Sequence, residues 1–153
     1  MKTSDWHTPI EKGELNILSV SWSSWDWYTK STTANNYNIC NSDELDSNSL
    51  EVIVMHNSGD LAEIYKLVFS GVGAYRLLGE HGLPEIFEIG GVEVNTFKVR
   101  GNGWSKESPS SFYMHTHDGW SYMLATGDEC VEVLCSQPPN IIKLQSVSEA
   151  KLT

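Results

Sequence analysis

The chain has 153 residues, of which 40% are hydrophobic and 10% aromatic, which is enough for one folded domain spanning residues 1–153. Twenty acidic residues against ten basic ones give a formal net charge of −10, and the bases are scattered along the sequence. Contact with nucleic-acid phosphate requires clustered lysine and arginine, so we expect no nucleic-acid partner. The acidity favours a basic protein partner, although ordinary solubility also explains it.

Residues 1–17 lack the apolar run of a signal peptide, and no stretch reaches the length of a transmembrane helix. Three cysteines, Cys40, Cys130 and Cys135, cannot all pair within one chain. We therefore expect a cytoplasmic protein with free thiols and no membrane association. Cys130 and Cys135 would face opposite sides of a strand, as small buried hydrophobes rather than joint metal ligands.

In the N-terminal half the apolar residues alternate with a period near two, which predicts β-strands. Residues 14–22 form the first predicted strand, with a slip in the alternation near Leu18, and Trp25 and Trp27 fall on the other parity, which suggests a bulge or turn around Ser23-Ser24. Residues 29–49 are rich in Asn, Ser and Asp and predict a long loop or irregular crossing. Strands over 50–55 and 61–69 follow, joined by the turn sequence Asn-Ser-Gly-Asp.

In the C-terminal half Gly71 and Gly73 interrupt the alternation before it resumes at residues 74–76, and Pro84 suggests one helical turn. Residues 92–101 predict a strand, whereas 101–119 fit no single element. Residues 120–136 predict a β-hairpin that turns at Gly127-Asp128, and residues 140–144 predict a last short strand. The expected fold is mainly β, with α+β possible. It is an antiparallel curled sheet, a sandwich or a partly open barrel, with at most one short helix.

The pair His115 and His117 is the main candidate for metal chemistry. Residues i and i+2 of a strand share a face, so both imidazoles could hold one ion. The pattern departs from that of cupin-type barrels, because no glutamate follows closely and no histidine follows His117. We expect both histidines to belong to the loop before the hairpin, and no cofactor apart from this possible metal.

Other signals for catalysis are weak. The chain has no Gly-x-Ser-x-Gly elbow, phosphate-binding glycine loop or Cys-x-x-Cys motif. Acids with apolar neighbours could have raised pKa values and act as general acids, namely Glu63, Glu80, Glu88 and Glu132. Aromatic residues crowd 22–28 and 104–122, where they predict core packing, a partner surface or a platform for sugars.

Two segments carry a family resemblance, "YKLVFSGVGAYRLLGE" at 65–80 and "SYMLATGDECVEVLCS" at 121–136. They resemble small bacterial β-rich proteins of unassigned function, some of which are similar to immunity proteins of toxin systems. The resemblance covers about a quarter of the chain. It implies a β-rich fold and a bacterial source, and it implies no catalytic residue.

Two classes of function stay open at this point. The first is a non-enzymatic domain that binds a basic protein, such as an immunity protein that neutralises a basic toxin. The second is a small-molecule-binding or metal-dependent β-barrel enzyme that uses His115 and His117. For the first class, acids beside aromatic anchors are the expected binding residues. These are Trp25, Asp26, Trp27, Asp43, Glu44 and Asp46.

Overall fold

The computed structural model describes residues 1–23, 28–30, 37–39, 48–79 and 94–148. These residues form three antiparallel sheets, in the strand orders β1-β8-β9-β10-β7, β11-β6-β5-β2 and β3-β4. The strands are β1 (Lys2–Asp5), β2 (Glu14–Ser23), β3 (Tyr28–Lys30), β4 (Tyr37–Ile39), β5 (Ser49–Ser58), β6 (Leu61–Phe69), β7 (Ala74–Gly79), β8 (Thr96–Arg100), β9 (Ser121–Ala125), β10 (Glu129–Leu134) and β11 (Asn140–Ser148). Two short helices, α2 (Gly103–Glu107) and α3 (Pro109–His115), lie between β8 and β9.

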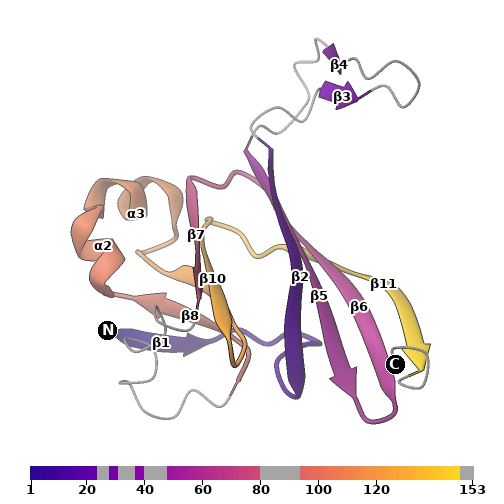
Figure 1. The fold of residues 1–153 in the computed structure, drawn as a ribbon. Coiled ribbons are helices and arrows are strands. Elements are labelled where there is room, and N and C mark those ends of the chain that lie inside the picture. The colour runs from indigo at the N-terminus through magenta and orange to yellow at the C-terminus, as the bar shows by residue number, and fades with distance from the viewer. Residues whose placement is uncertain (24–27, 31–36, 40–47, 80–93, 149–153) are drawn as a thin grey trace.

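The five-stranded and four-stranded sheets pack face to face as a sandwich (Figure 1). One buried apolar cluster joins them, with Val52, Leu67 and Phe69 from the four-stranded sheet and Val131 and Val133 from the five-stranded sheet. These residues come from alternating positions of their strands, which is why a period-two sequence can fill one continuous core. Neither sheet closes on itself, so the architecture is an open sandwich and not a barrel.

The five-stranded sheet is buried on both of its faces. A second cluster, formed by Phe97, Val99, Met123 and Cys130, lies on the face that points away from the four-stranded sheet. Figure 1 shows α2 and α3 on that outer side. The interior strand β10, between β9 and β7, is consequently covered from both sides, and its residues from Cys130 to Leu134 are all buried.

Most of the predicted strands are confirmed. The hairpin of β9 and β10 forms around Gly127-Asp128, and β5 and β6 form the hairpin expected at residues 57–60. The slip near Leu18 is a bulge in the pairing of β2 with β5, between Ile17 and Ser19. Because of this bulge, Leu15 and Val20 can both face the core from one strand.

Other expectations need correction. The strand β1 was not expected, since its four residues have little apolar character. The polar stretch 29–49 contains β4 and ends in β5, so it is not loop throughout. The stretch 101–119 holds two short helices, where at most one was expected in the whole chain. The helical turn suggested after Pro84 lies outside the described residues.

The two helices begin with ordinary local signals. The Asn102 side chain caps α2 by accepting a hydrogen bond from the backbone N–H of Ser105 at 3.0 Å. Pro109 occupies the first turn of α3, where its missing N–H costs no hydrogen bond. These signals were hidden by the Gly, Ser and Pro residues that surround them. No helix among the described ranges is long and apolar enough to cross a membrane.

Candidate functional site

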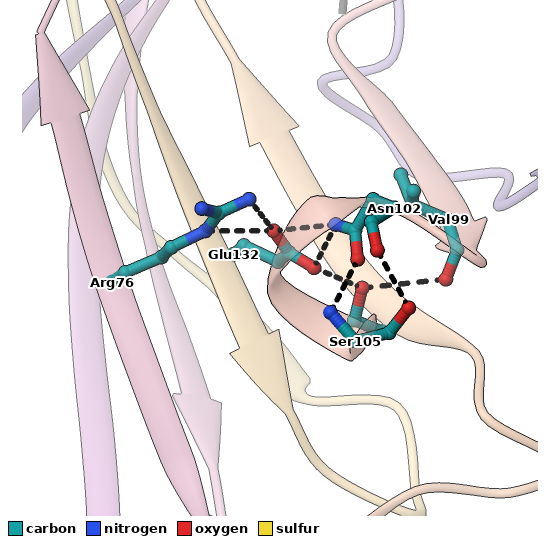
Figure 2. Close-up of polar contacts among 6 residues, drawn as sticks. Arg76, Val99, Asn102, Ser105 and Glu132 are labelled. Carbon is teal, nitrogen blue, oxygen red and sulfur yellow. Dashed lines mark hydrogen bonds and ion pairs between the residues drawn. The ribbon is translucent and has the colours of Figure 1, made fainter. Parts of the chain in front are cut away.

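The most developed polar cluster in the described structure surrounds Glu132 of β10. This side chain is fully buried on the outer face of the five-stranded sheet, beneath α2. A buried carboxylate is costly unless charged and polar groups surround it. The groups around the Glu132 carboxylate therefore indicate its role in the fold (Figure 2).

Three side chains donate to the two carboxylate oxygens of Glu132. The Arg76 guanidinium donates to Oε1 from Nε at 3.0 Å and from Nη2 at 2.7 Å. The Asn102 amide nitrogen lies 3.1 Å from Oε1 and 2.8 Å from Oε2. The Ser121 hydroxyl donates to Oε2 at 2.6 Å. The charge of the Glu132 carboxylate is thus balanced by Arg76, and both of its oxygens accept hydrogen bonds from the protein.

Long-range strand register brings these partners together. Arg76 of β7 is the direct cross-strand partner of Glu132 in β10, so both side chains lie on the same face. Asn102 arrives from the start of α2 and uses its other end to cap that helix. The Trp104 ring covers the guanidinium, with Arg76 Cζ 4.9 Å from the ring centroid. The cluster therefore attaches α2 to the sheet, which is a structural role.

His115 and His117 do not share a strand face as their spacing suggested. His115 is the last residue of α3, and its ring lies against the backbone of Gly73, where even an added Cβ atom would clash. His117 lies in a tight turn, paired with Trp120 across an isolated bridge. Its Nε2 is 3.8 Å from Asp118 Oδ2, and its side chain is mostly exposed. We expected both histidines in the loop before the hairpin. Only His117 lies there, because His115 belongs to α3.

The metal hypothesis gains no further ligand from the fold. Within the described ranges, no three His, Cys, Asp or Glu side chains group closely enough to hold a metal ion. The enzyme alternative also required a β-barrel, and the sheets form an open sandwich. The pair therefore stays a sequence prediction without a geometric counterpart.

A surface groove of about 750 Å³ lies beside α3 and the turn at residues 116–119. Its lining includes Arg100, Phe112, Tyr113, Met114, His117 and Asp118. Tyr113 and Met114 are 87% and 74% exposed, the highest values among the large exposed hydrophobic residues of the described part. Large apolar side chains that face solvent beside a groove are typical of binding surfaces.

Glu63 does not have the raised pKa expected of a general acid. The Tyr65 hydroxyl donates to its Oε2 at 2.7 Å and Lys143 Nζ donates to its Oε1 at 2.9 Å. These two hydrogen bonds hold the pKa of Glu63 below its usual value. The hydrogen bond from Tyr65 to Glu63 also raises the pKa of the Tyr65 hydroxyl to about 12. Glu63 is therefore a stable carboxylate, and Glu80 and Glu88 lie outside the described residues.

The two described cysteines are buried and unpaired, as expected from the sequence. Burial raises the pKa of the Cys130 thiol to about 11 and also raises the pKa of Cys135. A reactive cysteine needs a lowered pKa and access to solvent. Both thiols therefore act as small hydrophobic groups in the core.

The predicted partner-binding residues all lie outside the described ranges. These are Trp25, Asp26, Trp27, Asp43, Glu44 and Asp46. No protein-family model, no curated protein and no solved structure matches the chain.

The sequence did not predict the partners of Glu132 or the position of Arg100 in the lining of the groove. The apolar neighbours of Glu132 in "CVEVLC" signalled a buried acid. Its partners Arg76, Asn102 and Ser121 are up to 56 residues away in the sequence, and only the strand register brings them close. No local pattern could have selected them.

Proposed function

We propose that this protein is a non-catalytic domain that binds a basic protein partner. The observation that carries the proposal is the distribution of charge along the sequence. Residues 24–27, 40–47, 80–93 and 149–153 contain nine of the 20 acidic residues and one of the ten bases. The described ranges hold the other 11 acids and nine bases. Nearly all of the excess negative charge thus comes from a few short segments.

The bases of the sandwich do not neutralise this excess of negative charge. Three of its carboxylates pair with bases on the same sheet, Glu51 with Lys66, Glu63 with Lys143 and Glu132 with Arg76. The acids of residues 40–47 and 80–93, by contrast, have no Lys or Arg within their own segments. Clustered charge of one sign accelerates association with a protein of opposite sign and disfavours other partners.

The resemblance to immunity proteins supplies the class of partner, a basic bacterial toxin. In that case Trp25 and Trp27 are the aromatic anchors, and Asp26, Asp43, Glu44 and Asp46 are the charged contacts. Aromatic side chains flanked by charge are frequent hot spots of protein interfaces. The buried acid Glu132 supports a binding role over an enzymatic one, since its oxygens are occupied by structural donors.

The test is co-expression of this protein with the basic protein encoded by a neighbouring gene, followed by titration calorimetry of the purified pair. We expect rescue of growth and an affinity that falls as salt rises. The triple variant Asp43→Asn/Glu44→Gln/Asp46→Asn should weaken binding at least about tenfold.

A matched control removes the same charge from exposed acids of the sandwich, in the variant Glu14→Gln/Asp60→Asn/Asp128→Asn. This variant should change affinity by less than about threefold, because long-range charge alone is screened. An equal loss in both variants would reject the assigned residues. Absence of any complex would reject the proposed function.

A further inference from the structure

A second arginine, Arg100 at the end of β8, stacks on a tryptophan, and none of the described residues gives it a carboxylate partner. Its Cζ lies 4.8 Å from the ring centroid of Trp120, and Lys98 Nζ lies 6.0 Å from the same ring. Both cations are half-buried. Arg100 also lines the groove beside α3. A cation is therefore held in place at the edge of an open cavity.

Strand register adds a third base to this position. Lys2 of β1 is the direct cross-strand partner of Arg100, and Lys98 is two residues before Arg100 on the same strand. Residues so related share one face of a sheet. The bases that looked scattered in the sequence thus gather on one face of the five-stranded sheet. We call Lys2, Lys98 and Arg100 the basic cluster.

The basic cluster differs from the other cations of the two sheets. Lys66, Arg76 and Lys143 each form an ion pair with a glutamate. Over the described ranges no acid forms an ion pair with a member of the basic cluster. Asp118 is the acid that lines the groove among the residues that the structure describes, and its Oδ2 lies 3.8 Å from His117 Nε2. Arg100 is the member of the basic cluster that lines the groove, and Lys2 and Lys98 lie beside it on the same sheet face.

We propose that the groove binds an acidic segment of a partner protein, with a carboxylate on Arg100 and an apolar side chain on Tyr113 and Met114. The same protein shows the chemistry at Arg76, where a guanidinium stacked on a tryptophan holds the Glu132 carboxylate. Arginine binds carboxylates with strong charge-assisted hydrogen bonds. The exposed Tyr113 and Met114 side chains would be covered by the apolar part of the ligand.

The charge of the whole protein favours a peptide over a nucleic acid. A single strand of nucleic acid presents a phosphate at every nucleotide and would be repelled by the net charge of −10. A short peptide with a few carboxylates meets less repulsion and still neutralises Arg100. This groove is independent of the acidic segments of the proposed function, so either proposal can fail alone.

The first experiment measures fluorescence anisotropy of a labelled heptapeptide that alternates Asp with Leu, and of a twin with Asn in place of Asp. We expect the Asp peptide to bind at least about tenfold more tightly than the Asn twin. Arg100→Gln should remove at least about tenfold of that affinity, whereas Lys66→Gln on the other sheet should change it less than about twofold. Thermal melting of each variant checks that it is folded.

A second readout places the peptide in the groove. With methyl-labelled methionine, the Met114 signal should shift on addition of the Asp peptide, and Met114→Leu assigns that signal among the four methionines. If Arg100→Gln does not fold, the double variant Lys2→Gln/Lys98→Gln replaces it, with a loss of at least about threefold expected.

Three outcomes would overturn the proposal. The first is no binding of the Asp peptide at about 1 mM in low salt. The second is tighter binding of a labelled ten-nucleotide poly(dT) strand than of the peptide. The third is displacement of the peptide by acetate at an equal carboxylate concentration, which would assign the site to a small acid.

Discussion

Arg76 and Arg100 lie on the same five-stranded sheet, and each guanidinium stacks on a tryptophan at nearly the same distance, 4.9 and 4.8 Å. Arg76 also donates two hydrogen bonds to the buried Glu132. Among the described residues, Arg100 has no such carboxylate. One arginine is therefore part of the scaffold, and the other keeps its hydrogen-bonding capacity for a group from outside. An arginine stacked on a tryptophan thus has a structural role at position 76 and a binding role at position 100. The difference arises because Arg76 lies beside a buried glutamate, whereas Arg100 has no such neighbour among the described residues.

The largest expected effect is the loss of Arg76. Arg76→Gln leaves the fully buried Glu132 without its cation, and breaking a buried ion pair in this way costs about 3–5 kcal/mol of unfolding free energy. Chemical denaturation measures the loss. Arg100→Gln should cost less than about 1 kcal/mol, because it removes only a cation–π contact.

The double variant Arg76→Met/Glu132→Leu is the control for this difference. Removal of both charges avoids the unpaired carboxylate, so most of the stability should return. Equal destabilisation by Arg76→Gln and Arg100→Gln would show that the two arginines have the same structural role.

The next effect concerns Asn102, which connects α2 to the buried carboxylate of Glu132. Asn102→Ala removes both the helix cap and a hydrogen bond to Glu132, at a cost of about 2 kcal/mol. Asn102→Ser keeps a capping hydroxyl but shortens the side chain, so it should lose about half as much. Thermal and denaturant unfolding of both variants separates the two roles.

The last effect appears only at alkaline pH and tests how well the outer face of the sheet is buried. Burial raises the pKa of Cys130 from 9.0 to about 11. The unfolded chain therefore loses this proton at lower pH than the folded protein, and stability falls as pH rises from 9 to 11. The loss is on the order of 2 kcal/mol in the unfolding free energy.

Cys130→Ala supplies the control for the alkaline prediction. Its stability at pH 7 is lower, because a buried side chain is truncated, but its decline between pH 9 and pH 11 should be smaller than that of the unmodified protein. Parallel pH profiles for the two proteins would show that the Cys130 thiol is not protected from solvent.

Alternation of apolar residues and turn sequences predicted the β5–β6 and β9–β10 hairpins, since these depend on residues close in sequence, whereas the slip near Leu18 was seen but its bulge was not placed there. The helices α2 and α3 were missed because their start signals, Asn102 and Pro109, stand among loop-forming residues. The pairing of Lys2 with Arg100 joins residues 98 positions apart, and it depends on a register that no local pattern contains. The sequence therefore did not predict the contacts of either Arg76 or Arg100.

Gly73 has a consequence for the shape of the binding groove. The His115 ring occupies the space in which any side chain at position 73 would lie. His115 also ends the helix whose other residues, Phe112, Tyr113 and Met114, form one wall of the groove. A methyl group added at Gly73 would force the His115 ring to move, and with it the end of the helix that carries this wall. Position 73 therefore constrains the helix beside the groove although Gly73 does not line the groove itself.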